Sequence, residues 1–320
     1  MTGWAIAAAA AVAQPQVVVN VPAKHQLVEG VATDGAAIYV SSVLDRQILA
    51  CVKTCRTIAT LPEGLHPLGI SFDWGRKLLW IAADCPDVAG IPKCDRGALV
   101  AVNRQGKVRG RWAPATMPFH PGDVTATQSG IFVSDSQNGL VWALMPRRPG
   151  LRAVNRPGDG KSAQGTALAP SGTELMVADY ALGIGRIDLS TTATRWLPGR
   201  DGKPVRGIDG LVRCGDSYFG VYNGGAIPAR IYAFRMRPGG IDRTELVNGL
   251  RIVDPTQIAF DGKRLLVVSD SGWELIGKGK TTRDKGARIL SIRISRNCTA
   301  RKAPHRLRCS TGWPKAPRKF

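Results

Sequence analysis

The chain has 320 residues, with 44 lysines and arginines against 24 aspartates and glutamates, and a formal net charge of +20. This length exceeds a usual single domain, so it requires either two domains or one large repeated architecture. Frequent glycine (37) and proline (21) and short apolar runs favour an all-β chain, and no segment beyond the N-terminus is long and apolar enough to span a bilayer.

The N-terminus has the features of an export signal. An apolar, alanine-rich stretch ends in Ala11-Val12-Ala13, which has the small-x-small form that signal peptidase accepts. The first three residues carry no lysine or arginine, which departs from the usual signal. We expect residues 1–13 to be removed on export, and the mature protein to be periplasmic or secreted.

Internal repetition is the strongest pattern in the sequence. Six times, a short apolar strand ends in Asp, Asn or Ser, and these final residues are 42, 51, 44, 44 and 47 positions apart. That spacing is the length of one four-stranded propeller blade, about 40 to 50 residues. The six strands comprise residues 38–42, 79–84, 131–135, 175–179, 219–223 and 266–270.

A further apolar strand follows each of these six. It comprises residues 48–50, 99–102, 140–144, 185–189, 230–234 and 288–292. Because an isolated blade cannot bury both faces, the ring has to close. We therefore predict a six-bladed β-propeller over residues 14–295, in which Val17-Val18-Val19 supplies the outer strand of the last blade. The Asp and Asn residues that end the strands are expected to form turns.

Seven cysteines support an oxidising compartment. Three locally spaced pairs, 51 with 55, 85 with 94 and 298 with 309, suit short-range disulfides. Cys214 is left over, and we expect it to be a buried thiol. Zinc ligation is the competing interpretation, but the chain has no Cys-x-x-Cys, and His305 is the only histidine near a cysteine pair.

The innermost strand of each blade begins at one mouth of the central tunnel, where ligands bind in propellers. These beginnings are polar: oxygen donors come from Glu29, Asp123, Gln164, Asp209 and Asp254. Carboxylates gathered on one axis need a cation or protons to offset their repulsion. The sequence therefore predicts a cation site at this mouth.

Several of these segments resemble the blade-opening motifs of the gluconolactonase and regucalcin superfamily, which is related to the paraoxonases. The motifs are Glu29-Gly30 with Asp34-Gly35, Gly122-Asp123-Val124, Gln164-Gly165 with Pro170-Ser171-Gly172, and Ile208-Asp209-Gly210-Leu211. The resemblance covers residues 27–294 and implies a six-bladed propeller that binds a divalent cation and hydrolyses lactones or other esters. Glu29 and Asp209 match the family's metal-binding glutamate and aspartate. Gly122 and Gln164 stand where the family has asparagines.

From this resemblance we expect Glu29 and Asp209 to be metal ligands. Where the family asparagines are missing, the carbonyl oxygen of Gln164 and the adjacent Asp123 carboxylate are expected to rebuild the site with altered geometry, with calcium first and zinc or manganese as alternatives. Asp209 also takes a catalytic role through the metal. His66 and His120 precede inner strands and are candidates for the base that activates water, although His-Pro at a strand start is also ordinary turn chemistry. Asn223 and Asp254 are candidates for substrate contacts at the mouth.

The last 25 residues, 296–320, hold eight basic residues and no acidic one. We expect a basic tail that solubilises the protein or contacts an anionic envelope surface or polysaccharide, and no nucleic-acid partner, since no recognition helix or aromatic platform accompanies the charge. A monomer is expected. Two other functions stay open: a non-catalytic propeller that binds a small ligand or partner, and a metal-independent enzyme of the strictosidine-synthase type.

Overall fold

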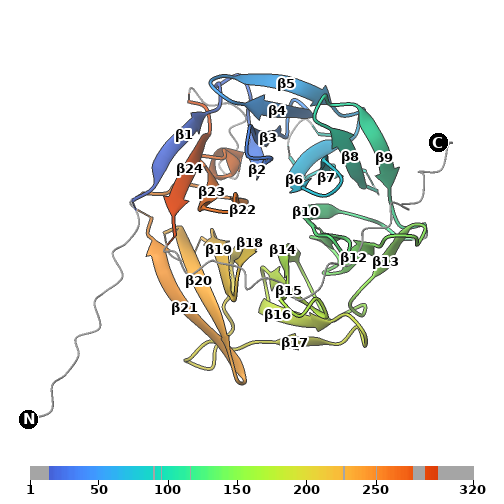
Figure 1. Cartoon of the computed structure of the whole chain (residues 1–320), viewed down its shortest axis with the longest axis vertical. Helices are drawn as coiled ribbons and strands as arrows, with labels where there is room; N and C mark the ends of the chain where they lie inside the picture. The colour runs from blue at the N-terminus through green and yellow to red at the C-terminus, as the bar shows by residue number, and fades with distance from the viewer. Residues whose placement is uncertain are drawn as a thin grey trace, which may run out of the picture.

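The computed structural model describes residues 14–88, 91–94, 96–115, 117–225, 228–249, 251–276 and 285–294. They form six four-stranded antiparallel sheets arranged as blades around a central axis (Figure 1). Within these residues the one α-helix is the short α1 (Trp273–Ile276). The prediction of an all-β, six-bladed propeller is confirmed.

The strands occupy equivalent places in the blades. The innermost strands are β2 (Val28–Thr33), β6 (His66–Asp73), β10 (Pro121–Ala126), β14 (Ala163–Leu168), β18 (Ile208–Cys214) and β22 (Ile258–Phe260). The second strands are β3 (Ile38–Ser42), β7 (Leu78–Asp84), β11 (Ile131–Asp135), β15 (Glu174–Asp179), β19 (Ser217–Tyr222) and β23 (Arg264–Ser269). The third strands are β4 (Gln47–Cys51), β8 (Ala98–Asn103), β12 (Val141–Leu144), β16 (Gly183–Asp188), β20 (Arg230–Arg237) and β24 (Arg288–Arg293).

The outer strands are β5 (Cys55–Thr60), β9 (Val108–Trp112), β13 (Leu151–Ala153), β17 (Thr194–Trp196), β21 (Gly240–Val247) and β1 (Gln16–Asn20). Strand β1 is the first of the chain, yet it pairs antiparallel with β24 in the last blade, with Gln16 opposite Ser291 and Asn20 opposite Arg288. The predicted closure of the ring by the N-terminal strand is therefore confirmed.

Burial explains why the second and third strands read as continuous apolar runs. All five residues of β11 are buried, because neighbouring blades cover both faces of each sheet. The outer strands are more exposed, as at Val108, Arg109 and Arg111 of β9. The core is a series of apolar layers between adjacent blades, such as the layer in which Ile48 of the first blade packs near Ile81 of the second.

One position in the inner strands repeats around the ring. It lies in a register shift near the start of the strand and is occupied by glycine in four blades, namely Gly30, Gly69, Gly165 and Gly210. A Cβ at Gly30 would lie 2.5 Å from the carbonyl oxygen of Leu68 in the next blade, so only glycine allows this approach. In the third and sixth blades the same position holds Asp123 and Gln257 instead.

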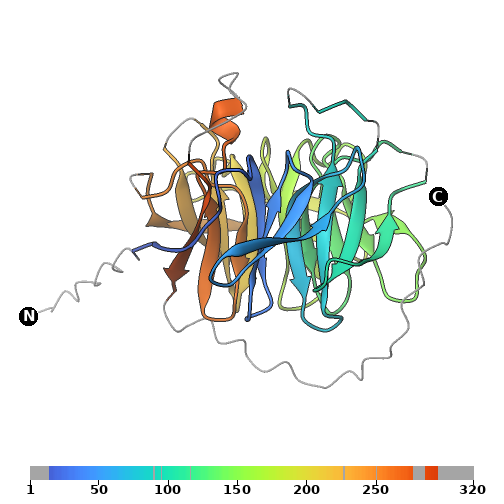
Figure 2. The same ribbon diagram turned by 90° about the horizontal axis from the view of Figure 1, so that it is seen from above.

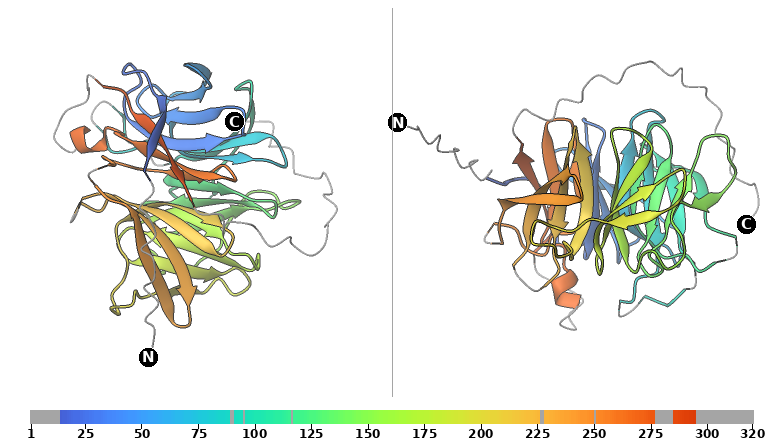
Figure 3. Two further views of the ribbon diagram at one scale, coloured as in Figure 1. Left: turned by 60° about the vertical axis from the view of Figure 1, so that its left-hand side comes forward. Right: turned by 90° about the horizontal axis from the view of Figure 1, so that it is seen from below.

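Two structural features rise from one face of the disc (Figure 2). They are α1 in the last blade and the loop that follows β7 in the second, and both stand at the face where the inner strands begin. Two further views show β1 at the outside of the ring beside β24, with which it pairs (Figure 3). This face is the mouth at which the sequence predicts a ligand site.

The expected turn role of the aspartates that end the second strands is confirmed for two of them. Asp135 accepts hydrogen bonds from the N–H groups of Gln137 and Asn138, at 3.1 and 3.0 Å. Asp179 does the same for Ala181 and Leu182. Asp84 and Asn223, at the equivalent positions of other blades, contact side chains at the mouth instead, as described below.

The cysteines agree with the sequence at two pairs. Cys51–Cys55 and Cys85–Cys94 are disulfides. Cys214 is 3% exposed and is also disulfide-bonded, so the expectation of a leftover thiol is wrong. The predicted Cys298–Cys309 pair, the signal segment 1–13 and the tail 296–320 lie outside the described residues. Among the residues that are described, no helix has the length and apolarity to cross a membrane.

Candidate functional site

Four carboxylates from different blades surround the axis at the mouth: Glu29 in β2, Asp123 in β10, Asp209 in β18 and Asp254 just before β22. Burial, and then the negative charge of Asp209, hold the pKa of Glu29 well above its usual range, and the charges of Asp123 and Asp254 add to this. The ring of acids that the sequence predicted is therefore assembled, and its members repel one another.

Asp209 is held by a neighbouring amide. Asn223 follows β19 and donates from Nδ2 to Asp209 Oδ2 at 2.8 Å and to the carbonyl oxygen of Pro255 at 2.9 Å. Burial raises the pKa of Asp209 to about 6; the Asn223 hydrogen bond opposes this shift, and the charge of Asp254 adds to it. The other end of the amide, Asn223 Oδ1, is buried and has no hydrogen-bond partner among the described residues.

Asp123 and Gln257 close the tunnel below these groups. Gln257 is 6% exposed, and its Nε2 donates to Asp123 Oδ1 from the opposite blade of the ring. Its Oε1 accepts hydrogen bonds from the N–H groups of Val31, at 2.8 Å, and Ile70, at 3.1 Å. One side chain of the sixth blade thus ties the first three blades together and forms a floor across the axis.

Burial raises the pKa of Asp123 to about 7, opposed by a hydrogen bond from the N–H of Val124 and increased by the charge of Asp209. The floor therefore contains a carboxyl group that is partly protonated near neutral pH. A cation above it would favour the charged form instead.

Helix α1 contacts two of the mouth acids. Trp273 Nε1 donates to Glu29 Oε2. Asp254 Oδ2 accepts from Ser271 Oγ at 2.6 Å and from the N–H of Gly272 at 2.8 Å, so it anchors the segment that begins the helix. Asp254 also has a positive φ of 42° before Pro255, an uncommon backbone conformation of the kind that recurs at functional sites. Its predicted contact with substrate stays a prediction.

Gln164 and Tyr180 border the mouth on the side of the third and fourth blades. Gln164 Nε2 donates to Ser162 Oγ at 3.2 Å, and its carbonyl oxygen lies beside Gly122, where a Cβ would be 3.3 Å away. Tyr180 donates its hydroxyl to the carbonyl oxygen of Asn223 at 3.0 Å. Burial and the charge of Asp209 raise the pKa of Tyr180 to about 12, so this phenol stays a hydrogen-bond donor.

The two histidines predicted as bases lie in different surroundings. His66 is 6% exposed, and its Nδ1 lies 2.8 Å from the carbonyl oxygen of Val43, as expected for a residue that supports a turn. His120 Nδ1 lies 3.3 Å from both carboxylate oxygens of Asp84. An imidazole oriented by a carboxylate is the usual arrangement of a general base, so His120 is the better placed of the two.

A cavity of about 590 Å³ lies on the far side of the floor. It is lined by the second halves of the inner strands, including Thr33, Ser71, Thr125 and Val212, and by Asp123 and Gln257 at its upper end. The hydroxyls of Thr33 and Thr125 already donate to carbonyl oxygens. Of the four mouth carboxylates, Asp123 lines this cavity, whereas Glu29, Asp209 and Asp254 do not.

The mouth offers the oxygen donors that calcium and similar hard cations prefer. Within the described ranges, no three of the mouth acids bring their oxygens within 4.8 Å of one another, so carboxylates alone do not form a preassembled set. The partnerless Asn223 Oδ1 next to Asp209 supplies an oxygen of the required kind. Glu29, Asp209 and Asn223 therefore fit a divalent cation, with Gln164 and Asp123 at the edge of the site.

Sequence reasoning missed three residues of this site: Gln257, Trp273 and Tyr180. The signal for Gln257 was present, because it breaks the glycine pattern of the inner strands at the same position as Asp123. Trp273 and Tyr180 carry no such signal, since their contacts with Glu29 and Asn223 depend on how loops cross between blades.

Comparison with known proteins defines the fold and no more. No family model and no curated protein matches the sequence. Among solved structures, a gluconolactonase from Xanthomonas campestris superposes with a TM-score of 0.60 at 15% identity, covering 88% of this chain and 89% of the other. The PQQ-bound aldose sugar dehydrogenase of Streptomyces coelicolor gives 0.59 at 13% identity, with 88% and 98% covered.

Virginiamycin B lyase from Staphylococcus aureus gives a TM-score of 0.55 at 12% identity and covers 88% of this chain and 99% of the other. These three proteins carry the names of three different reactions. Because likeness at such identities extends only to the architecture, the propeller is shared and the activity has to be argued from the site.

Proposed function

We propose that this protein is an exported, divalent-cation-dependent hydrolase that acts on lactones or related esters at the tunnel mouth. The observation that carries the proposal is the buried, partnerless Asn223 Oδ1 beside the Asp209 carboxylate, together with Glu29 and Asp123; the pKa values of these three acids are raised. A cation in this position offsets the repulsion and gives the amide oxygen a partner.

Glu29, Asp209 and Asn223 would hold the cation, with calcium as the first choice and zinc or manganese as alternatives. When bound, the cation supplies a Lewis acid that polarises the carbonyl oxygen of the substrate. Asn223 keeps Asp209 in place through its Nδ2, and Trp273 does the same for Glu29. The Asp123–Gln257 floor limits how deeply a substrate enters.

His120 is the candidate base for the attacking water. Asp84 faces Nδ1 and fixes the ring, which leaves Nε2 to accept a proton from water. Asp135 accepts a hydrogen bond from the His120 backbone N–H at 3.2 Å and so fixes the start of β10. Tyr180 stays protonated next to Asn223 and can donate to a polar substrate group.

The proposal is tested with a panel of lactones and aryl esters, with and without a chelator. We expect hydrolysis that the chelator abolishes and added calcium restores, and a loss of about 100-fold or more in kcat/KM for Asp209→Asn, since one preorganised electrostatic group contributes about that much. The control variant is Asp216→Asn, an exposed aspartate near the end of β18. Activity that survives the chelator would instead favour the strictosidine-synthase type of chemistry.

A non-catalytic ligand-binding propeller is the second candidate. It is favoured by the hydrogen bonds that already engage Glu29 and Asp123, and by the mouth acids not being preassembled around one point. Tight binding of calcium or of a lactone without turnover, measured by calorimetry and by product analysis on the same sample, would support this candidate over the hydrolase.

Export and surface contacts belong to the same proposal. The two disulfides suit an oxidising compartment such as the periplasm or the medium. Exposed arginines on four outer strands, Arg56, Arg109, Arg152 and Arg195, add to the positive charge of the chain at the rim of the disc. We propose contact with an anionic envelope surface or polysaccharide, which binding to heparin at low salt and release at high salt would test.

A further inference from the structure

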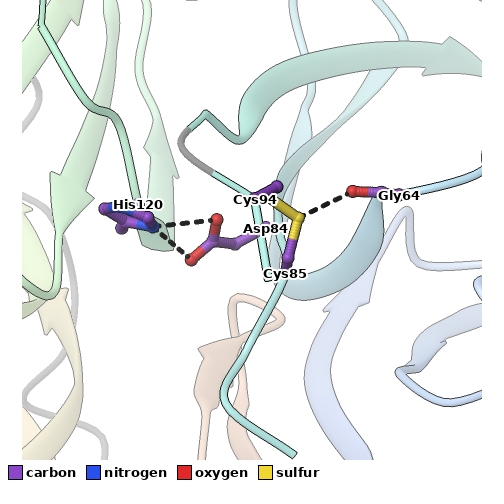
Figure 4. The surroundings of a disulfide bond; sticks show 5 residues. All are labelled: Gly64, Asp84, Cys85, Cys94 and His120. Carbon is purple, nitrogen blue, oxygen red and sulfur yellow. Dashed lines mark hydrogen bonds and ion pairs between the residues drawn. A yellow bond between two sulfur atoms is a disulfide. The ribbon is translucent and has the colours of Figure 1, made fainter. Parts of the chain in front are cut away.

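A second group of metal-type donors lies beside the mouth, around the Cys85–Cys94 disulfide (Figure 4). One carboxylate oxygen of Asp84 lies within 4.8 Å of both sulfurs, which the disulfide bond itself holds together. Among the described residues this is the one set of three such donors that meet in this way. Asp84 and Cys85 are buried and Cys94 is half-buried, so the group is enclosed by protein.

His120 supports this group from the third blade. Its Nδ1 lies 3.3 Å from both oxygens of Asp84, a distance longer than the roughly 2.8 Å of a short charge-assisted hydrogen bond. Zinc-bound ligands are commonly held by such an outer partner, which orients them. Burial raises the pKa of Asp84, so a nearby cation would be favourable for its charged form.

We propose that reduction of Cys85–Cys94 turns this cluster into a binding site for zinc or a similar thiophilic divalent cation. Asp84, Cys85 and Cys94 are the ligands, His120 holds Asp84, and water fills the fourth position. Thiolates select such metals, whereas the all-oxygen donors at the mouth select calcium-like ones. The chain would then carry two cation sites of different chemistry.

A dithiol can serve as the reductant of the Cys85–Cys94 disulfide. The dithiol transfers two electrons and two protons, the S–S bond between Cys85 and Cys94 breaks, two thiols form, and the reductant becomes a disulfide. Zinc then displaces both thiol protons to solvent as two Zn–S bonds form. Either crosslink, disulfide or metal, closes the segment between Cys85 and Cys94, so the loop stays tied at the mouth in both redox states.

The inference is tested on the full chain in its oxidised form and after reduction with a water-soluble phosphine, which gives the same two thiols without competing for metal. Cobalt(II) is added as the probe, the thiolate-to-cobalt absorption band is recorded, and zinc is added to displace it. We expect the reduced protein to bind one cobalt with this band and to exchange it for zinc, and the oxidised protein to show no band.

Variants locate the site among the other cysteines. Cys51→Ser/Cys55→Ser should keep the band after reduction, whereas Cys85→Ser/Cys94→Ser should lose it. Asp84→Asn should weaken zinc affinity by about 10-fold or more, and His120→Gln by about 10-fold, the usual effect of an outer partner. Near-ultraviolet circular dichroism of each reduced variant verifies that the propeller is still folded.

Two results would overturn the inference: an equal band in Cys85→Ser/Cys94→Ser, or no band in the reduced, folded Cys51→Ser/Cys55→Ser protein. If Cys85→Ser/Cys94→Ser does not fold, the comparison of Asp84→Asn with Cys51→Ser/Cys55→Ser decides. Equal zinc affinities in those two would also contradict the site.

Discussion

The two halves of the tunnel differ in what they offer a ligand. The half above the floor contains the carboxyl groups of Glu29, Asp209 and Asp254 and the partnerless amide oxygen of Asn223. The half below it has a cavity of about 590 Å³, lined mostly by apolar side chains and by hydroxyls such as those of Thr33 and Thr125 that already have partners; besides Asp123, its charged residues are Asp73 and Arg213. The size of a cavity and the ability to do chemistry are therefore separated here, and the Asp123–Gln257 pair marks the boundary.

The largest expected effect concerns this boundary. Gln257→Leu removes the donor to Asp123 and the acceptor for the N–H groups of Val31 and Ile70, and leaves them buried. We expect a loss of at least about 3 kcal/mol in the free energy of unfolding, measured by denaturant titration. Gln128→Leu is the matched control, an exposed glutamine at the edge of the lower cavity, with an effect under about 0.5 kcal/mol.

If both variants lost the same free energy of unfolding, the buried Gln257 of the floor would stabilise the fold no more than the exposed Gln128 does.

The next effect belongs to the mouth alone. Asn223→Ala removes the hydrogen bond that holds Asp209 and the buried amide oxygen. Calcium affinity should fall by about 10- to 100-fold or more, because the substitution removes both a proposed ligand oxygen and the hydrogen bond that orients Asp209. Unchanged affinity in a calorimetric titration would remove Asn223 from the site.

The acids of the upper half also predict a pH dependence. The pKa values of Asp123 and Asp209 are raised to about 7 and about 6 in the folded state, so the folded protein binds protons more tightly than the unfolded chain does. Stability of the metal-free protein should therefore fall as pH rises from about 4 through 7, and then level off. Thermal melts at several pH values measure this loss.

Asp123→Asn should flatten that curve, and added calcium should restore stability above pH 7. A melting temperature that rises over the same interval would contradict the raised pKa values.

The smallest effect is expected below the floor. Val212→Met places a longer apolar side chain toward the lower cavity, which has room for it. Hydrolysis and calcium affinity should both stay within about twofold of the unchanged protein, since apolar substitutions that fit cost little. A strong loss of activity would show that the lower half of the tunnel takes part in the function, and that cavity and chemistry are not divided between the two halves.

The fold could be predicted because its signals repeat. Six apolar strands recur every 42 to 51 residues, which predicts the number of blades. The apolar segment before them predicts the closure of the ring, which β1 provides. Glu29 and Asp209 could be placed at the mouth because each begins an inner strand. The contacts of His120 with Asp84 and of Trp273 with Glu29 could not, since they join side chains 36 and 244 residues apart across loops of irregular shape.

Cys214 shows the same limit of prediction from sequence. Its neighbours in sequence predict a buried strand residue, which is correct, but spacing alone does not reveal that it is disulfide-bonded. The recurrence of Asp and Asn at one position of the blade predicts turns, which is correct for Asp135 and Asp179. Only the packing of blades reveals that Asp84 and Asn223 contact His120 and Asp209.

Calorimetric titration of calcium into the metal-free protein and into Asp209→Ala, with Asp216→Ala as the control, tests whether the upper half of the tunnel binds a divalent cation through Asp209. We expect one bound calcium in the unchanged protein and in the control, and none in Asp209→Ala, whose propeller stays folded by circular dichroism. Stoichiometric calcium in folded Asp209→Ala would rule out a calcium site that depends on Asp209.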